Sequence, residues 1–222
     1  MAKVKNLNGL QVTSDNTTDE HLRALLESLR EYPHLRQVTI YQPKFTTAAA
    51  LADLPRHTGL TSLHLGRSEQ PGDDALAPLA NMPELTSLRL ESTALTDAVF
   101  AHLAALPRLR GLQLNSSRVT GSRLAALASL PQLLHLNLSG SGVTDAALAA
   151  LAKAEQLNRL DLSDMRVTDA GLRRLAACRS LRQLFVRKTQ VTPAGIAALR
   201  KDLPECLIFG DVAPPPAATS QK

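Results

Sequence analysis

Residues 157–180 read LNRLDLSDMRVTDAGLRRLAACRS, and the spacing of their apolar residues changes halfway along. In the first six residues, Leu157, Leu160 and Leu162 fall on one side and Arg159 and Asp161 on the other, which is typical of a strand. In the stretch GLRRLAAC the apolar residues recur three apart, with both arginines on the opposite side, which is typical of an amphipathic helix. The stretch therefore predicts one strand followed by one helix.

This pattern recurs along most of the chain. Units of 24 residues begin at positions 85, 109, 133 and 157, and a unit of 25 residues begins at position 181. Looser units precede them, one of 28 residues from position 7 and two of 25 residues from positions 35 and 60. One such unit cannot bury its leucines alone, but stacked copies share a core. The sequence predicts an α/β solenoid, with a curved parallel sheet on the concave face and helices on the convex face.

Threonine–aspartate pairs stand before three of the expected helices, at positions 96–97, 144–145 and 168–169. A threonine at this place can cap a helix, and an aspartate beside it complements the positive end of the helix dipole. Because the pair recurs from repeat to repeat, we interpret these aspartates as structural rather than catalytic.

The motif LxxLxL, followed by V-T-D-A and a second leucine pair, resembles the leucine-rich repeat superfamily. It is most similar to bacterial 24-residue repeats, which resemble the cysteine-containing repeats of F-box substrate receptors, and Cys178 in LAACRSL matches that subtype. Thr93, Ser117, Ser141 and Thr189 replace the asparagine or cysteine ladder of the family, and Met165 interrupts it. The resemblance implies a right-handed β-α superhelix that binds proteins. No F-box-like segment precedes the repeats, so a role as a ubiquitin-ligase adaptor is not supported.

The composition fits a soluble globular chain. Its 222 residues are 44% hydrophobic and 20% charged. No apolar run approaches the roughly 20 residues of a membrane span, and no signal peptide is recognisable at the start, so we expect a cytoplasmic protein without membrane contact. Cys178 and Cys206 are too few for a disulfide scaffold, and we expect buried, inert thiols.

We divide the chain into four parts: an N-terminal capping repeat (1–34), leucine-rich repeats (35–205), a C-terminal edge strand (206–211) and a disordered proline-rich tail (212–222). The cap is predicted from the helical pattern of TTDEHLRALLESLREYP, with Leu22, Leu25, Leu26 and Leu29 inward. A chain closed in this way is expected to be a monomer.

Motifs for catalysis or cofactor binding are missing. The sequence has no GxxxxGK, HExxH, CxxC or GxSxG, and we interpret SGSG at 139–142 as turn residues. His64 and His135 fall on strands about 14 Å apart, at about 4.8 Å per strand, too far to share a metal ion. We therefore expect no metal, no cofactor and no catalytic residue.

Nucleic-acid binding is also disfavoured. The net charge is +5, with 11 basic and 6 acidic residues in the last third of the chain (157–222), which favours an acidic partner. With only six aromatic residues in the whole chain, however, a base-stacking surface is missing.

The candidate binding surface is the concave face, where equivalent positions of parallel strands form columns. The central column is predicted to contain polar and varied side chains: Gln11, Thr39, His64, Arg89, Gln113, Asn137, Asp161 and Phe185. The predicted partner-binding residues are Phe185, Arg187, Arg159, Arg182, Asp161, Asn137, Gln113, Arg89, His64 and Tyr41. An aromatic residue among arginines is the composition of an interface hot spot.

Two structural alternatives remain for this cluster: Phe185 packs beneath the C-terminal segment, and Asp164 pairs with Lys188. A weaker second surface combines Tyr41 with the loop SEQPGDD at 68–74, because irregular loops often carry contacts.

The sequence thus predicts a non-catalytic, cytoplasmic, bacterial-type module that docks a protein partner, one with an acidic patch being a candidate. An alternative is a secreted bacterial effector that binds a host protein. An unrecognised enzyme is a third hypothesis, which the missing motifs disfavour.

Overall fold

The computed structural model describes residues 7–13, 17–41, 44, 47–67, 72–91 and 94–211. The predicted tail (212–222), Thr93 and part of the 68–74 loop lie outside the described residues.

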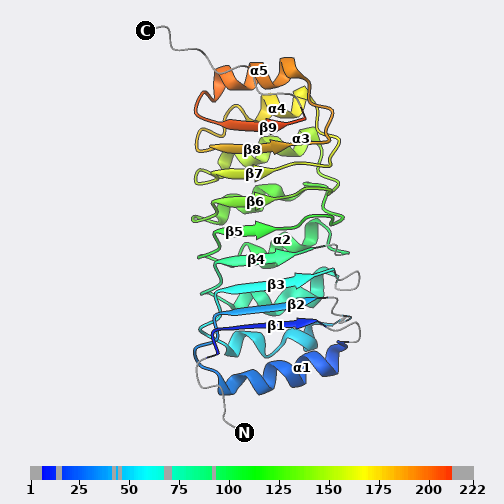
Figure 1. Cartoon of the computed structure of the whole chain (residues 1–222), viewed down its shortest axis with the longest axis vertical. Coiled ribbons are helices and arrows are strands. Elements are labelled where there is room, and N and C mark those ends of the chain that lie inside the picture. Colours follow the sequence, from blue (N-terminus) through cyan, green and yellow to red (C-terminus); the bar gives the residue numbers. More distant parts are fainter. Residues whose placement is uncertain are drawn as a thin grey trace.

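A single parallel sheet of nine strands runs through the described part of the chain, in sequence order (Figure 1). The strands are β1 (Gly9–Thr13), β2 (Gln37–Tyr41), β3 (Ser62–Gly66), β4 (Ser87–Leu90), β5 (Gly111–Gln113), β6 (His135–Asn137), β7 (Arg159–Asp161), β8 (Gln183–Val186) and β9 (Leu207–Gly210). The α/β solenoid predicted from the repeat is confirmed, and its last strand, β9, lies within the segment 206–211.

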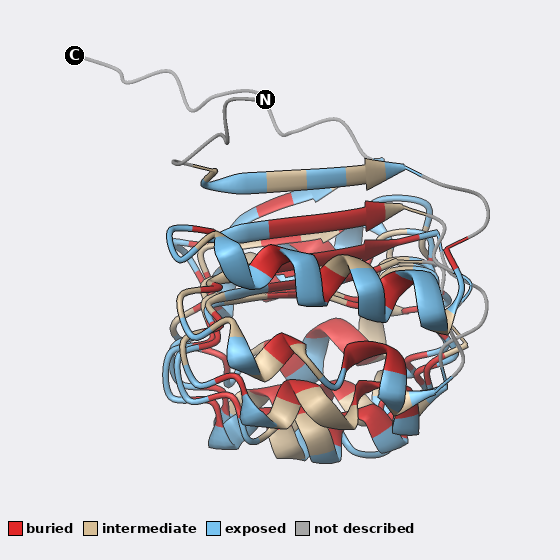
Figure 2. Cartoon of the chain, turned by 90° about the horizontal axis from the view of Figure 1, so that it is seen from below, coloured by how far each residue is buried: buried red, intermediate tan, exposed pale blue. Residues whose placement is uncertain are grey.

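The second layer consists of helices that cover one face of the sheet (Figure 2). Of the helices formed by the described residues, five are α-helices: α1 (Asp19–Ser28), α2 (Phe100–Leu103), α3 (Asp145–Leu148), α4 (Asp169–Leu175) and α5 (Pro193–Asp202). Seven are 3₁₀ segments: η1 (Leu29–Glu31), η2 (Ala48–Leu51), η3 (Leu54–Arg56), η4 (Asp73–Asn81), η5 (Asp97–Val99), η6 (Leu124–Ser129) and η7 (Ala149–Lys153). The sequence pattern does not distinguish these two helix types, because both place apolar residues three positions apart.

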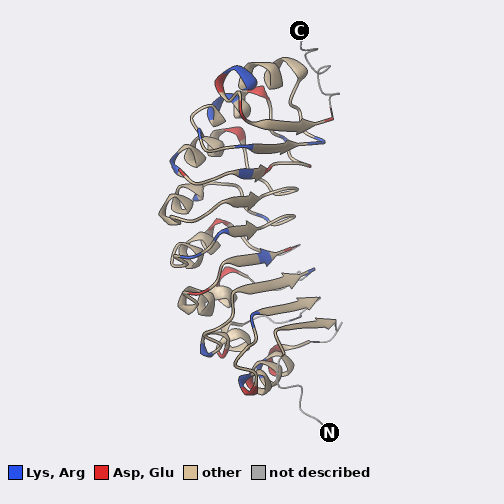
Figure 3. Ribbon diagram, turned by 60° about the vertical axis from the view of Figure 1, so that its left-hand side comes forward, with Lys and Arg blue, Asp and Glu red and all other residues tan. Residues whose placement is uncertain are grey.

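One hydrophobic core lies between the layers. The leucines of the strands and helices belong to a single buried cluster that runs from Leu22 to Ile208. In the 157–180 repeat, Leu157, Leu160 and Leu162 are fully buried, as the strand pattern predicted. In α1, Leu22 and Leu26 are buried, whereas Leu25 is only half-buried. The stack curves, and the sheet lies on the inner side of the arc (Figure 3).

Aspartates link one repeat to the next, a contact that the sequence analysis did not predict. The carboxylate of Asp169 accepts hydrogen bonds from the backbone N–H of Thr192 at 2.8 Å and from its hydroxyl at 2.6 Å. Asp145 accepts the same pair from Thr168, at 2.9 and 2.5 Å. We call each such contact an aspartate clip; others join Asp73 to Thr96 and Asp97 to Thr120. Each of these aspartates joins its repeat to the next one by hydrogen bonds.

The predicted threonine caps form in two of three cases. Thr96 and Thr168 accept hydrogen bonds from the first turns of their helices. The prediction is wrong for Thr144, whose side chain makes no capping bond. The clips account for this difference. Thr96 and Thr168 are each held by an aspartate of the preceding repeat, whereas the equivalent position before Thr144 is Gly121. Gly121 has φ of +89°, and a Cβ there would lie 2.5 Å from that of Ala147, so an aspartate does not fit.

Candidate functional site

The strand register brings the predicted central column together. Successive pairings align Gln11, Thr39, His64, Arg89, Gln113, Asn137, Asp161, Phe185 and Phe209 across the sheet. These residues point away from the leucine core, because side chains alternate between the faces of a strand. The column is therefore a continuous feature of the concave face.

An aromatic cluster forms at the C-terminal end of this column. The ring of Phe185 stacks on that of Phe209, with centroids 4.7 Å apart and planes 13° from parallel. The guanidinium of Arg159 lies over the Phe185 ring, 4.4 Å from its centroid, and Nη1 donates to Oε1 of Gln183 at 3.0 Å. Cation–π stacking and this hydrogen bond hold Arg159 in one orientation. We call Arg159, Gln183, Phe185, Leu207 and Phe209 the C-terminal cluster.

Of the two structural alternatives for this region, the pair of Asp164 with Lys188 forms, whereas Phe185 does not pack beneath the C-terminal segment. Phe185 packs against Phe209 of the C-terminal strand, but the packing is lateral and Phe185 remains half-buried rather than covered. Asp164 pairs with Lys188, at 3.2 Å between carboxylate and ammonium. The stacked pair thus leaves aromatic surface on the concave face.

Sequence reasoning did not include Leu207 and Phe209 among the candidate binding residues. Leu207 is 61% exposed and Phe209 is 36% exposed, and they are the exposed large hydrophobic residues of the described chain. Extending the register by one repeat from Phe185 would have placed Phe209 in the central column. Only the pairing of β9 with β8 shows that the register continues.

Arg182 and Arg187 lie outside the cluster. Arg182 precedes β8, donates to the carbonyl of Arg179 at 2.9 Å and pairs with Glu205 at 3.0 Å. Arg187 lies in the turn after β8 and is exposed, and its backbone N–H donates to the hydroxyl of Ser163 at 3.3 Å. Arg187 remains free to approach a partner, whereas Arg182 is engaged within the chain.

In the middle of the column, two predicted binding residues also shape their own turns. Oδ1 of Asn137 accepts from the backbone N–H of Ser139, and Oδ1 of Asp161 accepts from that of Ser163, each at 2.9 Å. Such contacts stabilise the chain as it leaves the strand. Gln113 lies beside them and is half-buried.

A second cluster lies at the N-terminal half of the concave face. The rings of Tyr41 and His64 meet edge to face with centroids 5.1 Å apart. Nε2 of His64 lies 3.5 Å from a carboxylate oxygen of Glu91, and Arg89 reaches the same oxygen at 3.8 Å. Gly66 makes this packing possible, because a Cβ there would lie 2.9 Å from both His64 and Tyr41.

His64 is buried to 8% exposure rather than offered to solvent. Burial lowers the pKa of His64, Arg89 lowers it further, and the Glu91 carboxylate partly offsets both. The lowered pKa favours the neutral form of His64, whose ring packs against Tyr41.

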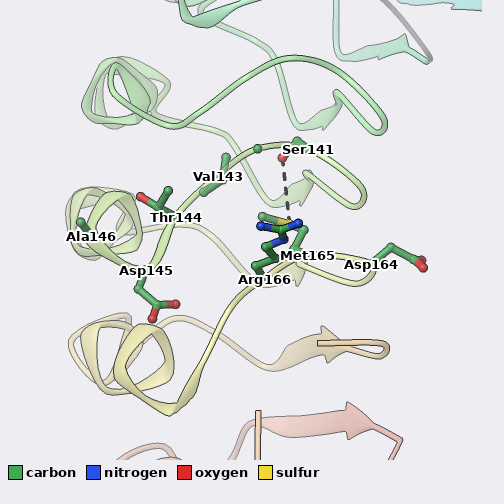
Figure 4. Close-up of a pocket in the computed structure, with 9 residues that line it drawn as sticks. Ser141, Val143, Thr144, Asp145, Ala146, Asp164, Met165 and Arg166 are labelled. Atoms are coloured by element: carbon green, nitrogen blue, oxygen red, sulfur yellow. Dashed lines mark hydrogen bonds between the residues drawn. The ribbon is translucent and has the colours of Figure 1, made fainter. Parts of the chain in front are cut away.

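A pocket of about 660 Å³ lies beside the sheet, among the loops that lead to the helices (Figure 4). It forms around Gly142, which occupies the position where the neighbouring repeats carry Arg118 and Arg166. Met165 and Arg166 reach toward Ser141, whose hydroxyl lies 4.0 Å from the Met165 sulfur. The carboxylate of Asp145 on its wall is already bound to Thr168. The pocket has no nucleophile paired with a base.

Other chemistry is equally limited in the described part of the chain. No group of three or more His, Cys, Asp or Glu residues could hold a metal ion there. Cys178 and Cys206 are buried free thiols, as predicted, and burial raises the pKa of each to about 11. Among the described residues, no helix is both long and apolar enough to cross a bilayer.

Comparison with known proteins agrees with the geometry. Residues 130–152 match a family profile described as leucine-rich repeat. The fold matches internalin C2 of Listeria monocytogenes with a TM-score of 0.66 and 23% identity, over 91% of this chain and 80% of that one. It also matches the plant peptide hormone receptor RGFR1, solved in complex with RGF2, with a TM-score of 0.54 and 13% identity. That match covers 94% of this chain and 33% of the receptor chain. No curated protein matches the sequence.

Residues 130–152 match a leucine-rich repeat, and the nine-stranded parallel solenoid of the described residues has the leucine-rich repeat fold. The chain therefore has the kind of domain that typically binds proteins and is usually not catalytic.

Proposed function

We propose that this chain is a non-catalytic module that docks a protein partner on its concave face, centred on the C-terminal cluster. One observation carries the proposal: a stacked phenylalanine pair under an oriented arginine lies at the half-exposed end of the central column. Aromatic residues and arginine dominate the binding energy of protein interfaces, because aromatic rings bury a large rigid area and the planar guanidinium combines stacking with several hydrogen bonds.

The charges around the cluster suggest the chemistry of the partner surface. Arg159 contacts an amide rather than a carboxylate, and the side chain of exposed Arg187 makes no ion pair within the described residues. The nearby acid Asp164 is paired with Lys188. A partner surface that is apolar and carries a carboxylate for Arg159 or Arg187 fits this arrangement.

The test replaces Arg159, Phe185 and Arg187 together by alanine. The bait is the full chain with a photo-cross-linker on the concave face, and captured proteins are identified and their affinity measured. We expect the triple variant to lose at least about tenfold in affinity for the captured partner. The matched control replaces Arg173 and Arg174, exposed on the convex helix α4, and should bind as the parent does. Equal capture by the triple variant, with unchanged circular dichroism, would reject the site.

We also propose a cytoplasmic location. Two free buried cysteines are compatible with a reducing compartment, and fractionation of the native cell tests the location directly. Recovery of the protein outside the cell would instead support the effector hypothesis.

A further inference from the structure

The last strand of the sheet, β9, has an open edge. No described segment pairs with its outer side, since the strand order ends at β9. The backbone N–H of Leu207 donates inward to the carbonyl of Arg182 at 2.8 Å. Alternate residues of a strand direct their N–H and C=O groups to opposite sides, so those of Ile208 and Gly210 face the open side.

The side chains of β9 are unusual for an edge. Leu207 and Phe209 are two residues apart, both point to the concave face, and both are exposed. The edge strand at the other end of the sheet, β1, carries Gly9 and Gln11 at the same column positions. Natural edge strands are usually protected by charged residues or proline within the strand, because an exposed apolar edge can pair with another strand. The sequence Leu-Ile-Phe-Gly of β9 has no such protection.

The charges at the two ends of β9 indicate which occupant fits. Glu205 lies just before the strand and Asp211 just after it, and both are exposed. Glu205 pairs with Arg182, and Asp211 accepts a hydrogen bond from the backbone N–H of Lys188. The Glu205 side chain nevertheless remains 73% exposed, so such a surface pair leaves negative charge facing solvent. In a second copy paired antiparallel about Ile208, Leu207 would face Phe209 of the other copy, but Glu205 would face its Asp211. Like charges directly opposite each other destabilise a strand pair. A strand with basic residues at these flanking places has the opposite sign and fits better.

We propose that β9 binds an extended segment of the partner protein that runs antiparallel to it and adds a tenth strand to the sheet. The segment places two apolar side chains, two residues apart, beside Leu207 and Phe209, and a lysine or arginine near Glu205 and Asp211. Main-chain hydrogen bonds to Ile208 and Gly210 supply affinity, and the alternating side chains supply selectivity. This inference rests on the proposed function and specifies how the partner engages the end of the docking surface.

The test uses a synthetic probe on the full chain. The probe is a seven-residue peptide with lysine at both ends and Thr-Ile-Thr-Val-Thr between them, so that lysine, isoleucine and valine share one face of a strand. Two matched controls carry glutamate in place of both lysines, or N-methyl groups on the three threonine nitrogens that would face β9. Binding is measured by fluorescence anisotropy and by hydrogen exchange of the Ile208 and Gly210 amides.

We expect the lysine peptide to bind and to slow exchange at both amides. The glutamate peptide, the N-methylated peptide and a Leu207→Thr/Phe209→Thr variant should each bind about tenfold or more weakly. The variant Gln11→Thr, at the equivalent column position of β1, should bind as the parent does. The inference fails if the N-methylated peptide binds equally, or if the lysine peptide leaves both amides unprotected.

Two further outcomes would assign the edge to another occupant and also overturn the inference. Concentration-dependent dimerisation that Phe209→Thr abolishes would point to a second copy. Protection of Ile208 in the free chain that is lost on deletion of residues 212–222 would point to the chain's own C-terminal segment.

Failure here is distinguishable from failure of the proposed function. If the threonine variant of β9 captures the cellular partner normally while the Arg159/Phe185/Arg187 variant does not, the concave docking function stands and strand addition does not.

Discussion

Removing the Asp97 clip tests how the repeats are held together. Asp97 is 9% exposed, and its carboxylate accepts hydrogen bonds from the N–H of Thr120 at 3.1 Å, from the hydroxyl of Thr120, and from the N–H of Gly121 at 2.8 Å. A hydrogen bond to a charged group contributes about 1.5–3 kcal/mol. In the variant, water can form hydrogen bonds with the exposed Thr120, so only part of this free energy is lost. We therefore expect Asp97→Ala to lower the free energy of unfolding by about 3 kcal/mol.

The pH dependence gives a second signature of the clip. Burial by itself would raise the pKa of Asp97, but the hydrogen bonds from Thr120 and Gly121 outweigh it and hold this pKa below its usual range. A lowered folded pKa means that the stabilisation is complete above the unfolded value of about 3.9 and is lost as pH falls through the folded pKa. The difference between parent and variant should therefore shrink below about pH 4.

Urea denaturation followed by circular dichroism at pH 7 and pH 3 provides the measurement. The control, Asp74→Ala, removes an exposed aspartate from the same layer and should change the free energy by no more than about 0.5 kcal/mol. The explanation is refuted if Asp97→Ala is as stable as this control, or if its loss is the same at both pH values.

Three other perturbations test separate parts of the fold. Gly195→Ala should destabilise the chain by about 1–3 kcal/mol, because the added Cβ would lie 2.0 Å from Oδ1 of Asp169, the carboxylate that clips Thr192. Gly72→Ala, with nothing within 4 Å of the added Cβ, is the control, and equal melting temperatures of the two variants would contradict the clip. In the parent, the lowered pKa of His64 should make the free energy of unfolding fall below about pH 6.5, because the unfolded chain takes up a proton that the folded chain resists. His64→Gln should reduce this fall, and urea titrations at pH 5 and pH 7 measure it; an equal fall in parent and variant would contradict the explanation. Cys178 and Cys206 should react with a thiol reagent at pH 8 far more slowly in the native protein than in urea, because both thiols are buried and have a pKa of about 11. Similar reaction rates in the two conditions would show that the core opens readily.

Much of the fold could be predicted because local sequence patterns determine the structure of each repeat. The alternation around Leu160 determines which face of the strand is buried, and a recurring length of 24 residues aligns Arg89, Asp161 and Phe185 in one column. The aspartates were correctly interpreted as structural, but their hydrogen-bond partner was not predicted. A carboxylate at this position can interact with the N-terminus of its own helix or bind the next repeat. Only the distance from Asp169 to Thr192 decides between these.

The binding surface divides in the same way between sequence and structure. Period and alternation alone determined that a parallel sheet presents its polar positions on one concave face, because the leucine core leaves those side chains no other direction. Side-chain packing decided which of them remain available: His64 is buried under Tyr41, Arg182 is engaged by Glu205, and Arg159 rests on Phe185. The exposure of Leu207 and Phe209 was also a tertiary result, because whether an edge strand is covered depends on what packs beside it in space.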